Sequence, residues 1–158
     1  MRRLSCIVLV LAGVAGCSGG SYAPVTGTVT LRGRPVAGAT VVFTPDPPAE
    51  GATAATARTG DDGSFRLQTN LPGGVTRDGA GPGKYKVTVS KFVPPGGMTE
   101  EQYAKRAEAA RLPDKPYSSD ATVPPRVEAF PREFSDVSAT TVTATVTSGS
   151  NEVKIDVP

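Results

Sequence analysis

The sequence contains no histidine and no tryptophan, and only two of its 158 residues are cysteines. Without histidine no Ser–His or Cys–His pair can form, so the common routes to an activated nucleophile are excluded. The same absence leaves no Cys/His ligand set for zinc. We therefore expect a protein that is not an enzyme and that holds neither a cofactor nor a metal ion.

The chain also lacks a strong excess of charge and a long hydrophobic run. It has 17 basic and 15 acidic residues, and two of the basic ones, Arg2 and Arg3, stand at the extreme N-terminus. The rest of the chain has 15 residues of each sign, so nothing favours a nucleic acid as partner. The apolar run at residues 4–14 is shorter than the roughly 20 residues that span a bilayer.

This apolar run has the length of the hydrophobic region of a secretory signal peptide, about 7–15 residues. The two arginines precede it, and the small residues Ala15 and Gly16 separate it from Cys17. We predict a signal peptide at residues 1–16 and a short polar tether at residues 17–24. Cys6 would be lost with the leader, so no disulfide is expected.

The segment Val14-Ala15-Gly16-Cys17 resembles the lipobox of bacterial lipoproteins. The resemblance implies that the Cys17 thiol carries a diacylglyceryl group, and that the new amino terminus is often acylated as well, as with palmitate. Two or more chains anchor a protein stably, at about 0.8 kcal/mol for each buried CH₂. Ser18, rather than an aspartate, favours the outer membrane over the inner one. The alternatives are a secreted protein with a free Cys17, or a short membrane helix.

Glycine, proline, threonine and valine dominate the rest of the chain, as is typical of short strands joined by turns. Removal of residues 1–16 leaves 142 residues, enough for one domain with its own core. Alternating apolar and polar residues, with turn residues between them, predict six or seven strands, of which the one at residues 52–59 is weakly patterned. These are expected at residues 25–31, 39–44, 52–59, 64–69, 84–90, 142–146 and 153–157. We expect residues 59–63 to form a tight turn and residues 70–81 a glycine-rich loop.

Residues 94–131 break this pattern and are expected to form an irregular, helical insertion. Thr99 and Gln102 have the spacing of a capping box, which predicts a surface helix over residues 99–111. Its weakly apolar face would be Tyr103, Ala107 and Ala110. Glu101 and Lys105 stand four residues apart and can form an ion pair. Because residues 112–131 hold five prolines, limited proteolysis is expected to cut between residues 94 and 131 first.

Three fragments, in the right order, resemble carboxypeptidase regulatory-like domains: residues 33–41 (GRPVAGATV), 59–65 (TGDDGSF) and 82–85 (PGKY). The residues from Phe130 to Phe134 and the last two strands look like the tail of short bacterial lipoproteins that carry this domain alone. The resemblance implies a transthyretin-like or Ig-like Greek-key β-sandwich of about seven strands, which would occupy residues 25–158. The expected fold class is therefore all-β, with one short helical insertion.

Few charged groups suggest a site. Asp61 and Asp62 next to Gly63 could indicate calcium, but Asp-x-Asp-x-Asp spacing is missing and a turn is favoured. Paired carboxylates could catalyse hydrolysis, although the acidic residues stand at turns and at outward strand positions. A basic patch is the third alternative, but lysines on exposed strands more often prevent aggregation. That patch would combine Arg32, Arg34, Lys84 and Lys86.

We expect a non-enzymatic lipoprotein of the cell envelope, held on a membrane through Cys17, that acts as a structural or protein-interaction module. Its partner would be an envelope protein, which could belong to a transport or secretion system. The alternative is a carbohydrate-binding module, because β-sandwiches often bind glycans. The absence of tryptophan argues against that alternative, since sugars usually stack on aromatic side chains.

Overall fold

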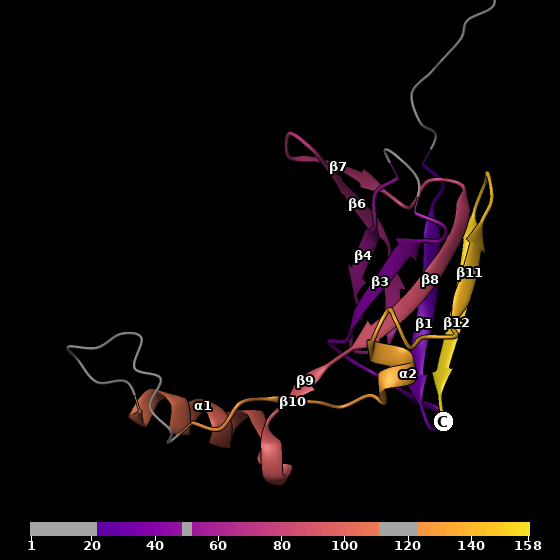
Figure 1. Ribbon diagram of the computed structural model, residues 1–158. Coiled ribbons are helices and arrows are strands. Elements are labelled where there is room, and N and C mark those ends of the chain that lie inside the picture. The colour runs from indigo at the N-terminus through magenta and orange to yellow at the C-terminus, as the bar shows by residue number, and fades with distance from the viewer. Residues whose placement is uncertain (1–21, 49–51, 111–122) are drawn as a thin grey trace, which may run out of the picture.

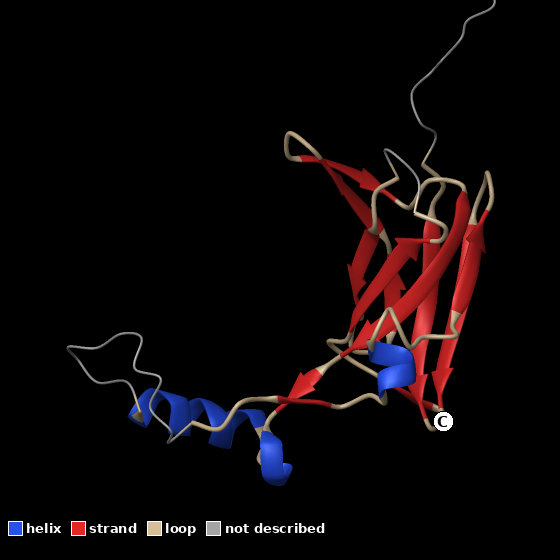
Figure 2. Cartoon of the chain, viewed as in Figure 1, coloured by secondary structure: helices blue, strands red, loops and turns tan. Residues whose placement is uncertain are grey.

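The structure is a computed structural model that describes residues 22–48, 52–110 and 123–158. The predicted signal peptide, the lipobox with Cys17, and most of the predicted tether lie outside the described residues. Two β-sheets face each other and enclose one core, while a helical arm extends to one side (Figures 1 and 2). The predicted all-β sandwich with a short helix is confirmed.

The larger sheet has six strands in the order β11-β8-β3-β4-β6-β7, and each neighbouring pair is antiparallel. Its long central strands contain the β-branched and aromatic residues that favour a pleated, half-buried surface. The strands are β3 (Thr40–Pro45), β4 (Ala55–Arg58), β6 (Gln68–Leu71), β7 (Val75–Asp78), β8 (Gly83–Ser90) and β11 (Thr143–Val146).

The smaller sheet is built around β1 (Val25–Leu31), the predicted first strand. The C-terminal strand β12 (Asn151–Val157) lies parallel to it along its full length, so the first and the last strand of the domain are neighbours. On its other side β1 pairs with β2 (Arg34–Pro35) and with β5 (Ser64–Arg66), both antiparallel. The first and the last strand of the domain therefore form the middle and one edge of this sheet.

Alternate residues of both sheets supply the core, as the sequence pattern predicts. Alternate apolar side chains of β1, β3 and β8 are buried, Leu31 at the end of β1 is partly buried, and the rings of Phe43 and Tyr85 meet with centroids 5.9 Å apart. Among the described residues, every buried side-chain nitrogen and oxygen has a hydrogen-bond partner. The largest fully buried side chains are Phe43, Leu67, Val25, Val29, Val41, Val87, Val89, Val157 and Thr69.

Gly27 is the point of closest approach in the smaller sheet. It stands at an inward position of β1, directly opposite Phe65 of β5. A Cβ atom at Gly27 would lie 2.0 Å from the carbonyl oxygen of Val153 and 2.5 Å from the ring of Phe65. The absence of a side chain at this position is therefore what lets the Phe65 ring enter the core.

The prediction of one strand over residues 64–69 is wrong in one respect, because the chain changes sheets at Leu67. The segment before it, β5, pairs with β1 of the smaller sheet, and the segment after it, β6, pairs with β4 of the larger sheet. Leu67 itself donates to the carbonyl of Val25 and accepts from the amide of Gly79. The alternation of buried Phe65, Leu67 and Thr69 continues across the change, so the pattern alone could not show it.

The prediction of a loop over residues 70–81 is also wrong. β6 and β7 form a hairpin whose turn contains Gly73 and Gly74, both with positive φ. The hydroxyl of Thr76 donates to the side chain of Asn70 across the two strands. Every residue of β7 is exposed, so the apolar alternation from which strands are predicted is missing there.

The last two strands are not partners of each other. β11 pairs with β8 of the larger sheet, whereas β12 pairs with β1 of the smaller sheet. The short connection between them therefore crosses from one sheet to the other. The side chain of Asn151 holds this connection, accepting from the amide of Thr147 and donating to the carbonyl oxygens of Thr147 and Gly149.

Residues 92–110 and 123–128 form the described part of the arm. It begins with β9 (Phe92–Val93), which follows β8 closely, and ends with β10 (Val127–Glu128), which pairs with β9. Between them lie a 3-10 turn, η1 (Pro95–Gly97), and the helix α1 (Glu100–Ala109). After the arm, α2 (Arg132–Ser135) returns to the sandwich, where Phe130 is buried and Phe134 packs against the core.

The predicted helix is confirmed in its start and in its apolar face. The Thr99 side chain accepts from the amide of Gln102, and the Gln102 side chain accepts from the amide of Thr99, so both halves of the capping box are present. Tyr103, Ala107 and Ala110 are its partly buried residues, and the others are exposed. Lys105 and Glu101 form the predicted ion pair at 2.9 Å. The helix ends at Ala109, and Arg111 lies outside the described residues.

Candidate functional site

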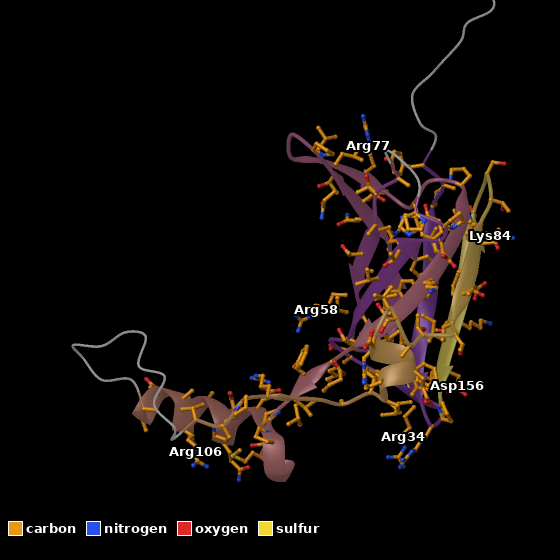
Figure 3. All side chains as sticks on the ribbon, in the orientation of Figure 1. Arg34, Arg58, Arg77, Lys84, Arg106 and Asp156 are labelled. Carbon is orange, nitrogen blue, oxygen red and sulfur yellow. The ribbon has the colours of Figure 1, made fainter. Side chains whose placement is uncertain are left out.

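A hollow of about 680 Å³ lies where the arm leaves the sandwich. Its floor is a row of three side chains, Ser90, Thr40 and Arg58, which are direct neighbours on β8, β3 and β4. Its wall comes from the arm, with Phe92, Glu100 and Arg126 among the lining residues. We call this hollow the junction groove. In Figure 3 Arg58 projects from the side of the larger sheet on which the arm extends.

The junction groove contains two cations that take part in no ion pair with any described residue. The Arg58 guanidinium and the Lys91 ammonium both line it, and neither has a carboxylate within 4 Å in the described part of the chain. Asp61 lines the same groove, so the groove contains charges of both signs and its electrostatic potential is only weakly positive. A guanidinium next to two hydroxyl groups is suited to bind a carboxylate through charge-assisted hydrogen bonds.

Arg126 holds the first turn of α1 against the base of the arm. Its two terminal nitrogens donate to the two carboxylate oxygens of Glu100 at 2.8 and 2.7 Å, and its guanidinium lies 4.6 Å from the centre of the Tyr103 ring. The Tyr103 hydroxyl donates to the carbonyl oxygen of Pro124 at 3.0 Å. The hydrogen bond from Arg126 lowers the pKa of Glu100, and Lys91 adds to that effect. These contacts fix one wall of the junction groove.

Glu128 joins the arm to the end of the sandwich. One of its carboxylate oxygens accepts from the backbone amides of Lys91 and Phe130, at 2.9 and 3.1 Å. The amide of Ala129 donates to the carbonyl of Lys91. These bonds hold β10 and the residues after it to Lys91, the residue that joins β8 to β9, so the base of the arm is fixed to the sandwich although α1 buries no residue.

The ribbon exposes apolar side chains beside the groove. Phe92 is 59% exposed and Val127 is 47% exposed, and they lie on the two paired strands of the ribbon. The sequence interpretation singled out neither residue: Phe92 stands just before the predicted insertion at residues 94–131, and Val127 lies within it. The sequence did contain a signal for an exposed Phe92. The outward-facing residues of β8 have even numbers, and Phe92 continues that alternation beyond Ser90.

The residues singled out from the sequence do not come together. Lys84 lies near one end of the larger sheet and Arg34 near the opposite end of the sandwich (Figure 3). The suggested basic patch of Arg32, Arg34, Lys84 and Lys86 is therefore not a single surface. Arg32 and Arg34 instead line a separate hollow of about 620 Å³ with Pro131.

Asp61 and Asp62 have different surroundings. One carboxylate oxygen of Asp62 accepts from the hydroxyl and the amide of Ser64, and these bonds lower the pKa of Asp62. Asp62 is thus part of the predicted turn at residues 59–63, while Asp61 lines the junction groove. In the described ranges, no three histidine, cysteine or acidic side chains come close enough to hold a metal ion. Nor do those ranges contain a helix that is long and apolar enough to cross a membrane.

Cys17 lies outside the described residues, so the structure does not show its surroundings. The first described residues, Tyr22 and Ala23, lead directly into β1. Comparisons with protein-family models, with curated proteins and with solved structures give no match for this chain.

Proposed function

We propose that the chain is a non-enzymatic lipoprotein of the cell envelope, anchored through lipid on Cys17, whose arm and junction groove bind an envelope protein. One observation carries this proposal: the arm extends from the end of the sandwich opposite to the end where the N-terminal tether joins it (Figure 1). A domain held at its N-terminus would therefore present the arm away from the membrane.

Strand directions support this arrangement. The tether leads into Val25, at one end of β1, and Leu31 marks the other end. β8 runs toward that second end, where Ser90 pairs with Thr40 and the arm begins. Seven strand residues span about 23 Å, at roughly 3.3 Å per residue, so the groove and the tether are separated by most of the length of the sandwich.

The composition of the arm supports a protein as partner. A helix of about ten residues is marginal in water by itself, and α1 buries none of its residues against the sandwich. The ribbon adjacent to the helix exposes Phe92 and Val127, and the groove contributes the cations Arg58 and Lys91. Interfaces are enriched in aromatic and arginine anchors, so a partner with apolar and acidic side chains fits this surface.

We also propose that the sandwich belongs with the carboxypeptidase regulatory-like domains. The three fragments that carry the resemblance lie at connections and at the start of a strand: residues 33–41 lead into β3, residues 59–65 into β5, and residues 82–85 into β8. Gly63 has φ of 74°, and a Cβ there would lie 2.6 Å from the carbonyl oxygen of Val29. The second glycine of the fragment at residues 59–65, Gly63, is therefore required by the backbone conformation and by the close approach of β1.

Fractionation of cells tests the anchor. With Cys17→Ser, the thiol that would carry the lipid is lost, and the protein is expected to move from the membrane pellet to the supernatant after a carbonate wash. Ser18→Ala is the matched control and should stay in the pellet. A Cys17→Ser protein that stays membrane-bound would show that the anchor assignment is wrong.

Photo-crosslinking in intact cells tests the partner surface. A photoreactive phenylalanine analogue in place of Phe92 is expected to capture one discrete protein, because this side chain is exposed at the edge of the groove. The same analogue in place of Thr145, an exposed residue of β11, is the control. Arg58→Ala, added to the variant that carries the analogue at position 92, should reduce the amount of crosslinked product. Equal capture from both positions, or from neither, contradicts the proposed surface.

A glycan is the second candidate ligand. The hydroxyls of Ser90 and Thr40 lie side by side in the floor of the groove, close to the exposed ring of Phe92, and sugars bind such combinations of hydroxyl and aromatic groups. A glycan array separates the two candidates. Binding that Phe92→Ala abolishes would favour the carbohydrate-binding module, and an array without signal would favour the protein partner.

A further inference from the structure

The hairpin of β6 and β7 projects beyond the core at the end of the sandwich where the tether joins (Figure 1). Its last cross-strand pair is Leu71 with Val75, on either side of the turn at residues 72–74. Val75 is 44% exposed, and Arg77 is exposed on the same strand. Figure 3 shows Arg77 directed away from the sheet at this end of the molecule. The hairpin thus presents the exposed side chain of Val75, the partly buried side chain of Leu71 and the cation of Arg77 to the surroundings.

The base of this hairpin is bound directly to the tether. Ala23 and Ala80 form an antiparallel bridge, in which each amide donates to the other carbonyl, at 2.9 and 3.0 Å. At Gly79, one residue after β7, a Cβ would lie 1.9 Å from the carbonyl oxygen of Ala23, so the two segments touch. Tyr22 lies close enough to Tyr85 to contribute, after burial, to a raised pKa of the Tyr85 hydroxyl.

The covalent chain limits how far this end can lie from a lipid on Cys17. Five residue steps separate Cys17 from Tyr22, and an extended chain covers at most about 18 Å over that distance, whatever path it takes. β7 adds four residues, or about 13 Å, between the bridge at Ala80 and the hairpin turn. A lipid-anchored domain therefore holds the hairpin tip within reach of the bilayer surface.

We propose that the β6–β7 hairpin tip is a second membrane contact, with Leu71 and Val75 at the bilayer interface and Arg77 on the phosphates of anionic lipids. This inference rests on the anchor at Cys17 proposed above. Two apolar side chains and one arginine bind a membrane weakly when the protein diffuses freely. The tether makes the contact intramolecular, and the resulting high effective concentration allows a weak contact to persist. The contact would orient the junction groove away from the membrane.

A tryptophan probe tests the contact, because the chain contains no tryptophan of its own. In a chain that starts at residue 17, which keeps every described residue, Cys17 is the only thiol and can be coupled to a maleimide lipid in vesicles. Val75→Trp is expected to emit at shorter wavelength on vesicles and to be quenched by brominated acyl chains. Phe92→Trp, at the exposed base of the arm, is the matched control and should be unaffected.

The outcomes separate this inference from the anchor. Absence of quenching at Val75→Trp, or stronger quenching at Phe92→Trp, overturns the hairpin contact. Chemical coupling does not depend on cellular lipidation, which the fractionation of Cys17→Ser tests by itself. A normal shift of Cys17→Ser to the supernatant together with an unquenched Val75→Trp would therefore reject the hairpin contact alone.

Arg77→Gln tests the lipid charge. On vesicles that contain phosphatidylglycerol, this change in the Val75→Trp chain should lower the docked-to-free ratio by about five-fold, because one arginine near an anionic surface contributes about 1 kcal/mol. On neutral phosphatidylcholine vesicles it should have no effect. An equal effect on both vesicles, or no effect on either, overturns the assignment of Arg77 to lipid phosphates.

Discussion

The sandwich and the arm hold their shapes by different means, and two phenylalanines show the difference. Phe43 is fully buried between the sheets, whereas Phe92, at the start of the arm, is 59% exposed. The sandwich depends on apolar contacts between residues far apart in the sequence. The arm depends on a capping box, ion pairs and a two-stranded ribbon, and no residue of its helix is fully buried.

This comparison separates stability from binding. A change in the arm removes local hydrogen bonds from a region with little buried surface, so it should affect the arm before it affects the whole domain. A change in the sandwich acts on the cooperative core. We therefore expect that the arm can carry residues that a partner requires with little effect on the stability of the sandwich.

The largest expected effect comes from the two phenylalanines themselves. Phe43→Ala should lower the free energy of unfolding by about 3–5 kcal/mol, because it leaves a cavity in the core. Phe92→Ala should change it by no more than about 0.5 kcal/mol, as expected for an exposed side chain. Urea unfolding of both variants measures this. Similar losses in the two would mean that the arm shares the core of the sandwich.

Thr59 tests a buried polar contact of the sandwich. Its hydroxyl donates to the carbonyl oxygen of Val36 at 2.6 Å and accepts from the amide of Ala39 at 2.8 Å. Thr59→Val leaves both groups without this partner and should cost about 1–3 kcal/mol. The control is Thr30→Val, which removes an exposed hydroxyl bond to Asp156 and should cost less. Equal unfolding midpoints for the two variants would show that the buried hydroxyl of Thr59 contributes no more to stability than the exposed hydroxyl of Thr30.

Thr99→Ala tests the independence of the arm. Loss of the cap should destabilise α1 by about 1 kcal/mol, because the amide of Gln102 loses its acceptor. Amide hydrogen exchange should become faster in α1 and remain unchanged in β8, with the unfolding midpoint of the domain unaltered. Faster exchange in β8 as well would show that the arm and the sandwich open together.

The smallest effect is a pH dependence confined to the arm. Arg126 lowers the pKa of Glu100 from its ordinary 4.5, so the ion pair stabilises the arm above that pH and is lost as the pH falls through the lower folded pKa. Arg126→Gln should return the pKa of Glu100 toward 4.5, as measured by NMR of its side-chain carboxyl. An unchanged Glu100 titration would show that the pair does not persist in solution.

The candidate site was only partly predictable. Capping residues act within one helical turn, so Thr99 and Gln102 indicated α1 correctly. Arg126 and Glu100 are 26 residues apart, and no local rule joins them. Similarly, Ser90, Thr40 and Arg58 are far apart in the sequence, and only the register of three strands makes them the floor of one groove.

The sequence by itself determined the elements whose cause is local: the alternating strand at residues 25–31, the turn at residues 59–63 and the capped helix. It also carries the lipobox resemblance at Cys17, which stays a prediction. Only the tertiary structure decided that Leu67 passes from one sheet to the other, that β7 is a strand, and that β12 pairs with β1. The physical reason is that alternating burial, turns and helix caps each require particular residues at a fixed local spacing, which can be recognised in the sequence. The choice of partner strand depends on contacts between distant segments, which no local pattern records.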